Sequence, residues 1–294
     1  MPFWASISIL GLVQAALVAL PVPRQRPAWI GRLSSSWWAL VPALSIAVVI
    51  GAIEISPGSA DALTYIALAA VPPLAAYALA ALTRVRVSPP YTRVQADSRS
   101  GGAGWLAPVS VVVALFVLAW ASPHSLAGEA AATALSGLGC VTLGWLLVCV
   151  VAAPWLRLGV YAMAAIDVCF VAADLLQGPN AVLSAAAPAA DLPRLQAVHF
   201  GSALMGFGDL FVAALVGCLL AAEPALPSAS QRRPLNWQLV AAALVAALAL
   251  CFDLLFFAVD QLPATVPVAL ALALVQWRRA AGVSDGNQAV SGPG

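Results

Sequence analysis

Two aspartates, Asp167 and Asp209, each lie inside a long apolar stretch, and the second closes the run Met205-Gly206-Phe207-Gly208-Asp209. A carboxylate in the hydrocarbon core of a membrane costs roughly 2.5 to 3.5 kcal/mol on insertion scales, so two at similar depth call for a functional role. Two facing carboxyl groups there share one proton, because desolvation and mutual repulsion oppose ionising both. Aspartyl proteolysis uses such a pair: one acid activates water while its protonated partner polarises the peptide carbonyl. The pair therefore predicts acid–base hydrolysis.

Gly206 and Gly208 directly precede the second acid. Because glycine has no β-carbon, another backbone can approach closely at these two positions. A substrate helix must unwind before its peptide bond is attacked, and its exposed backbone groups then need partners in the protein. We expect this glycine-lined strip to pair with such a backbone as a strand would. Ordinary helix packing through small residues is the alternative interpretation.

A third candidate segment is Gln261-Leu262-Pro263-Ala264-Thr265-Val266-Pro267. Its two prolines interrupt helical hydrogen bonding, which a membrane protein tolerates where the backbone lines a cavity. A helix that simply starts with proline in its first turn explains the spacing equally well.

Composition indicates the class of fold. Hydrophobic residues make up 63% of the chain, charged residues make up 9%, and the mean hydropathy is +0.96, which is typical of polytopic membrane proteins. About 20 apolar residues cross a bilayer as a helix. We therefore predict an all-α fold with nine transmembrane helices, over residues 3–22, 37–56, 62–83, 105–122, 130–152, 158–176, 199–221, 236–258 and 263–277. On these bounds Asp167 and Asp209 are each about nine or ten residues from a helix end, near the middle of the membrane.

The basic residues predict the orientation, because loops rich in arginine stay in the cytoplasm. All thirteen are arginines, and all but Arg194 follow the first, third, fifth, seventh or ninth stretch: Arg24, Arg26, Arg32, Arg84, Arg86, Arg93, Arg99, Arg157, Arg232, Arg233, Arg278 and Arg279. This places the N-terminus outside and the C-terminus in the cytoplasm. The first stretch has no positively charged n-region, so we expect a retained helix rather than a secretion signal.

Three parts follow from this arrangement. Residues 1–157 hold helices one to five as a scaffold, 158–279 hold the catalytic helices six to nine, and 280–294 form a disordered cytoplasmic tail. Glu129 and Asp253 lie near helix ends and are interpreted as interfacial.

Several classes of function find no support. A net charge of +1 gives no reason to expect a nucleic-acid partner. The five cysteines lie in predicted helices without CxxC spacing, and His124 and His199 have no ligand spacing, so we expect neither a metal nor a cofactor. The absence of lysine, with heavy use of alanine and arginine, indicates a GC-rich bacterial genome and hence the plasma membrane as compartment.

Taken together, these motifs resemble the presenilin and signal peptide peptidase family of intramembrane aspartyl proteases, the GxGD type. That family has nine helices, with Tyr-Asp in the sixth, GxGD in the seventh and Pro-Ala-Leu at the ninth. Here Ile166-Asp167-Val168, Gly206-Phe207-Gly208-Asp209 and Pro263-Ala264-Thr265 occur in the same order, with Ile166 in place of tyrosine and Thr265 in place of leucine. The short stretch between the aspartates and the orientation look more like the signal peptide peptidase branch.

The resemblance implies roles for individual residues. Asp167 and Asp209 form the catalytic pair, Gly206 and Gly208 shape the seventh helix, and Pro263, Ala264 and Thr265 help to form the active site. The implied partners are single-pass membrane proteins or signal-peptide substrates in the lipid bilayer, with no cofactor. The oligomeric state is left open.

Three alternatives remain. A proton-coupled transporter also uses carboxyl groups at mid-membrane. A catalytically inactive presenilin-like protein is compatible with the residues at 166 and 265. The third alternative is a prepilin peptidase, because Asp174-Leu175 followed by Pro179-Asn180 is similar to the first acidic motif of those enzymes. Their second motif has a lysine two residues after the aspartate, whereas Leu210-Phe211 follows Asp209 here, so this interpretation ranks lower.

Overall fold

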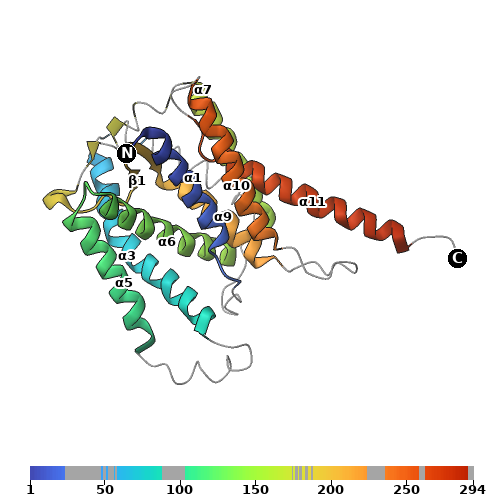
Figure 1. Cartoon of the computed structure of the whole chain (residues 1–294), viewed down its shortest axis with the longest axis horizontal. Coiled ribbons are helices and arrows are strands. Elements are labelled where there is room, and N and C mark those ends of the chain that lie inside the picture. The colour runs from blue at the N-terminus through green and yellow to red at the C-terminus, as the bar shows by residue number, and fades with distance from the viewer. Residues whose placement is uncertain are drawn as a thin grey trace.

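The structure is a computed structural model that describes residues 1–23, 48, 51, 56, 58–87, 103–173, 175, 178, 181–182, 185–186, 188–223, 236–257 and 262–290. The described part is all-α, with one small hairpin of two strands (Figure 1). Most of the predicted second helix, 37–56, lies outside the described residues, as does Asp174 of the prepilin-peptidase alternative.

Each of the other eight predicted stretches overlaps one α-helix. Their bounds are α1 (Phe3–Ala19), α3 (Gly58–Val87), α5 (Ala103–Ala121), α6 (Leu126–Val150), α7 (Ala153–Ala172), α9 (Phe207–Ala222), α10 (Trp237–Asp253) and α11 (Val266–Val290). Two short 3₁₀ turns are also present, η2 (Ala189–Asp191) and η3 (Leu254–Phe257). Within the part of the chain that the structure describes, three helical segments are long and apolar enough to cross a membrane: Gly58–Thr83, Leu126–Val150 and Ala153–Ala172.

The helices pack around α9, which is buried along most of its length, from Leu210 to Leu220. Helices α3, α5 and α6 lie together on one side of it, and α7, α10 and α11 lie on the other (Figure 1). Helix α1 packs against both α9 and α10, and its Leu10 and Val18 are fully buried in the same core cluster as Val216 and Leu272. The first helix therefore shares one core with the helices that carry the candidate site.

Close helix contacts depend on glycine at two positions of this core. A β-carbon on Gly217 of α9 would lie 2.5 Å from the backbone oxygen of Val18 in α1. One on Gly144 of α6 would lie 3.1 Å from the Cα of Leu215. Small residues let helix backbones approach in this way, as they do between membrane helices.

Before α9 the chain forms an antiparallel hairpin, β1 (Ala197–Phe200) and β2 (Ala203–Gly206), in which Ala197 pairs with Gly206 and Phe200 with Ala203. Gly201 in the turn has φ +59°, a conformation that favours glycine. The prediction of a helix over 199–221 is therefore wrong at its start, since the helix begins at Phe207. As a consequence, Asp209 lies in the first turn of α9 and not near its middle.

The C-terminal end also differs from expectation. Helix α11 continues to Val290, so residues 280–290, predicted to belong to a disordered tail, are helical. Its last turns extend away from the other helices (Figure 1). Ala280 and Ala281 are strong helix formers and no proline follows until Pro293, so the helix runs on although Gly282 and Gly286 are weak helix formers.

Candidate active site

Asp167 of α7 meets the segment just before α11. The hydroxyl of Thr265 donates a hydrogen bond of 2.6 Å to Oδ2 of Asp167, and the backbone N–H of Thr265 donates a second, of 3.3 Å, to the same oxygen. Thr265 is 4% exposed, so its hydroxyl needs a partner inside the protein and finds it in this carboxyl group. Two of the three sequence motifs are thus joined directly.

Asp209 lies on the same side of the structure. Helices α7 and α9 contact each other, both contact α11, and the charge of Asp167 acts electrostatically on Asp209. Oδ2 of Asp209 accepts the backbone N–H of Gly206 at 3.2 Å, the return bond of a helix capping box. Both acids are half-buried. The structure therefore brings Asp167, Asp209 and Thr265 into one site.

The two glycines border this site in different ways. Gly206 ends β2, and a β-carbon there would lie 3.3 Å from Oδ2 of Asp209. Gly208 is exposed, and a β-carbon there would meet no described atom within 4 Å. Open space thus lies one residue before the second acid.

The segment Pro263-Ala264-Thr265 forms a turn before α11 begins at Val266. The side-chain amide of Gln14, in α1, donates a hydrogen bond of 3.2 Å to the backbone oxygen of Ala264. Gln14 is only 2% exposed, so this contact holds the turn from inside the protein. Sequence reasoning missed this residue, although an isolated amide inside a predicted membrane helix is itself a signal of a buried polar contact.

The chain just before α9 is also anchored. The N–H of Gly201, in the turn of the hairpin, donates a hydrogen bond of 2.6 Å to Oε2 of Glu129 in α6. The N–H of Ser202 donates to Oγ of Ser6 in α1 at 3.2 Å. Glu129, interpreted from the sequence as interfacial, therefore helps to position the strand that leads to Asp209.

His199 lies in the same hairpin, outside the candidate membrane-spanning helices. Its Nε2 is buried and has no hydrogen-bond partner among the described residues. Burial lowers the pKa of His199, and Arg194 lowers this pKa further, while Glu129 acts in the opposite direction.

At the far end of α7 a cluster of charges ties several helices together. Arg157 of α7 and Arg279 of α11 both form ion pairs with Glu223, the C-cap residue that directly follows α9. The guanidinium of Arg279 also lies 6.0 Å from the ring centre of Trp237 in α10. We call Arg157, Glu223 and Arg279 the ionic cluster.

The ionic cluster provides a reference point for the position of the acids. Asp167 is ten residues beyond Arg157, about 15 Å along the helix, and Asp209 is fourteen residues before Glu223, about 21 Å. Between the two levels, the hydroxyl of Tyr161 hydrogen-bonds to the side-chain oxygen of Gln276 at 3.2 Å. Asp209 is in the first turn of α9, so this helix begins at about the same distance from the ionic cluster as the acids.

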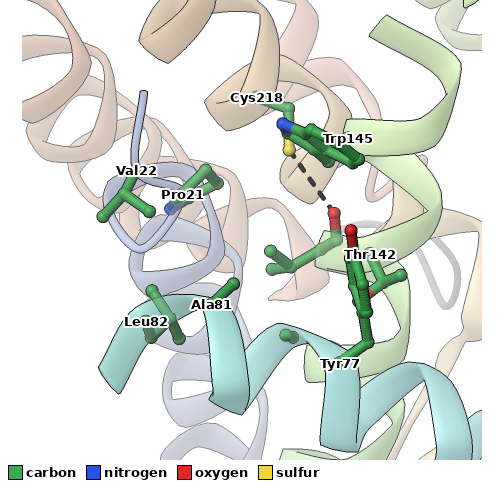
Figure 2. A pocket seen from close by; sticks show the side chains of 10 residues that line it. Pro21, Val22, Tyr77, Ala81, Leu82, Thr142, Trp145 and Cys218 are labelled. Atoms are coloured by element: carbon green, nitrogen blue, oxygen red, sulfur yellow. Dashed lines mark hydrogen bonds between the residues drawn. The ribbon is translucent and has the colours of Figure 1, made fainter. Parts of the chain in front are cut away.

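A separate apolar pocket lies between the end of α1 and helices α3, α6 and α9 (Figure 2). Val22, Ala81, Leu82 and Trp145 are among its lining residues, and the thiol of Cys218 donates to the backbone oxygen of Val141 at 3.6 Å beside it. Neither acid lines this pocket. Within the described ranges, no group of three or more histidine, cysteine or acidic side chains could hold a metal ion.

Comparisons with protein-family models, with curated proteins and with solved structures gave no match. The presenilin-like resemblance is thus carried by the three motifs and their order along the chain.

Proposed function

We propose that this chain is an intramembrane aspartyl protease, similar to the signal peptide peptidases, in which Asp167 and Asp209 are the catalytic pair. One observation carries the proposal: three motifs from distant parts of the sequence come together, through the Thr265 hydrogen bonds to Asp167, the packing of α7 against α9, and the electrostatic influence of Asp167 on Asp209. Two acids and a turn without regular helical structure are the parts that peptide hydrolysis inside a membrane requires.

The proposed topology has nine membrane-spanning helices, with the N-terminus outside and the C-terminus in the cytoplasm of a bacterial cell. The ionic cluster supports it, because the start of α7 meets the end of α9 and Arg279, which follows the predicted ninth membrane stretch, as alternating helices require. Likewise, Gln238 at the start of α10 donates to the backbone oxygens of Val18 and Pro21 near the end of α1. With this end at the cytoplasmic surface, acids about 15 to 21 Å away lie near the middle of a core about 30 Å thick.

The site geometry also favours an extended substrate. Strand β2 pairs with β1 along one edge, and the open space at Gly208 follows directly after β2. An unwound transmembrane segment that runs beside β2 would satisfy its own backbone groups and bring a peptide bond to the acids. The substrates we propose are single-pass membrane proteins or signal-peptide remnants.

A proton-coupled transporter is the second candidate, favoured by one specific observation. Between Asp167 and the ionic cluster, the hydroxyl of Tyr161 in α7 hydrogen-bonds to the side chain of Gln276 in α11, so polar groups recur along this helix pair as they would along a proton path. A transporter would move protons or a solute without breaking a peptide bond.

One experiment separates these functions. The full chain is reconstituted in liposomes with a single-pass reporter helix, and cleavage is followed by mass spectrometry for wild type, Asp167→Asn and Asp209→Asn. We expect cleavage by wild type, its loss in both variants, and inhibition by a peptide isostere whose hydroxyl mimics the tetrahedral intermediate. Asp253→Asn is the matched control, since Asp253 is a buried acid bonded to Ser8 between α1 and α10, and it should cleave normally.

The outcomes that contradict the proposal are specific. Cleavage that persists in Asp167→Asn and Asp209→Asn would remove the pair from the mechanism. Proton or solute flux that needs both acids, without any cleavage, would favour the transporter. The absence of both activities in a folded wild-type protein would leave the inactive presenilin-like protein.

A further inference from the structure

We propose that Thr265 assigns different roles to the two acids, so that Asp167 is the ionised base and Asp209 carries the shared proton in the resting site. This inference rests on the proposed protease function. It makes Thr265 a positioning residue with a defined effect, at the place where the family has a leucine that could donate no side-chain hydrogen bond.

The hydrogen bonds of the two acids are unequal. Asp167 receives two donors on one oxygen, and the 2.6 Å hydroxyl contact is in the range of charge-assisted hydrogen bonds. Asp209 receives the Gly206 N–H at 3.2 Å, a longer bond from a neutral backbone donor. Donors aimed at a carboxylate stabilise its charged form. When two facing acids share one proton, the proton therefore resides on Asp209.

The N-terminus of α9 acts in the opposite direction, because a helix start stabilises a negative charge on Asp209. This dipole effect is spread over the first turn of the helix, and the Gly206 N–H lies 3.2 Å from Asp209, whereas the Thr265 hydroxyl makes a direct contact of 2.6 Å with Asp167. We therefore expect the Thr265 hydrogen bond to stabilise the ionised form of Asp167 more than the helix dipole stabilises the ionised form of Asp209.

Thr265 is held in place to do this. Its backbone oxygen accepts the N–H of Ala269 at 3.0 Å, so it stands at the start of α11, and the preceding carbonyl of Ala264 is held by Gln14. A threonine at a helix start often turns its hydroxyl to its own helix. Here the hydroxyl bonds to α7 instead, with both donors of one residue on one oxygen.

The roles give a balanced reaction. Ionised Asp167 takes a proton from water as the water oxygen bonds to the peptide carbonyl carbon, and Asp209 gives its proton to the carbonyl oxygen. The carbon–nitrogen bond of this diol then breaks: Asp167 returns its proton to the leaving amine, and Asp209 recovers one from a hydroxyl of the diol. The site ends as it began, with the proton on Asp209.

The test uses protein variants that retain one acid of the pair, so that it does not depend on a substrate. In Asp209→Asn, Asp167 remains, and infrared spectroscopy follows the carbonyl band of its protonated carboxyl group against pH. Adding Thr265→Val, which removes the hydroxyl but keeps the shape, should move the appearance of this band to higher pH by about one to two units. Thr265→Ser should restore the original position.

In the Asp167→Asn background, Thr265→Val should leave the band of Asp209 in place. In the active protein, Thr265→Val should shift the acidic limb of the plot of kcat against pH to higher pH, and Thr265→Ser should not. A shift of the Asp209 band, or an unmoved Asp167 band, would overturn the assignment. If wild type cleaves no reporter, the protease proposal fails, and the infrared comparison still decides how the two carboxyl groups differ.

Discussion

Gly208 offers a test in which stability and activity should change in opposite directions. It lies in the first turn of α9, its φ is not in the left-handed region, and a β-carbon there meets no described atom within 4 Å. Alanine is favoured over glycine inside a helix by about 0.5 to 1 kcal/mol. Gly208→Ala should therefore stabilise the folded protein slightly.

Cleavage should fall in the same variant if the substrate backbone occupies the open space beside Asp209. A methyl group there displaces that backbone by about 1 Å, and a misplacement of this size can cost roughly 100-fold in rate. Thermal unfolding followed by circular dichroism measures the first effect, and initial rates of reporter cleavage in liposomes measure the second.

Gly139→Ala is the matched control, because it adds a β-carbon in α6 that makes an ordinary 3.4 Å contact with Val71, away from the acids. Its cleavage rate should match that of wild type. A Gly208→Ala protein that cleaves as fast as wild type would show that the substrate does not pass this residue, and the reasoning from the open space would be refuted.

Two further predictions concern the scaffold. Gly217→Ala should destabilise the protein by about 1 to 3 kcal/mol, since its β-carbon would lie 2.5 Å from the Val18 backbone oxygen, and an unchanged or raised melting temperature would contradict the close packing of α1 on α9. In the folded protein the pKa of His199 lies below its ordinary value of 6.5. The unfolded chain therefore binds a proton at His199 more readily, so the folded protein loses stability as the pH falls below 6.5. Wild type should thus lose thermal stability between pH 7.5 and pH 5.5, by scans at matched ionic strength, and His199→Gln should lose less over that range (roughly the titration window of an unperturbed histidine).

The helices could be predicted because long apolar stretches have few other solutions, and the structure confirms an all-α fold over the described residues. The start of α9 could not. Residues 198–206 are apolar enough to continue a helix, and a short apolar run does not distinguish a strand from a buried helix. The turn at Gly201 has a positive φ, which favours a hairpin over a continuous helix. A glycine in a sequence does not show which φ it adopts, so this turn could not be predicted.

The site shows the same division. Asp167, Asp209 and Thr265 could be singled out because each belongs to a short motif. Gln14 could not be, since its partner Ala264 is 250 residues away and only the packing of α1 against the rest of the core brings them together. Glu129 likewise gains its role from contact with the hairpin turn. Residues that position a site through long-range contacts leave no local pattern to read.

Contacts at two places along the α7–α11 pair hold Asp167 in position while the neighbouring glycines leave the site open. At one end the ionic cluster joins α7 and α11 through Glu223, and at the other Thr265 joins α11 to Asp167. A slide of α7 along α11 would break the ion pairs at one end and the Thr265 hydrogen bonds at the other, so these contacts set the level of Asp167. Gly206 and Gly208, by contrast, are exposed. Held acids beside an open approach are the combination that the proposed hydrolysis of an unwound membrane segment would require, because the acids must be preorganised while the substrate enters from one side.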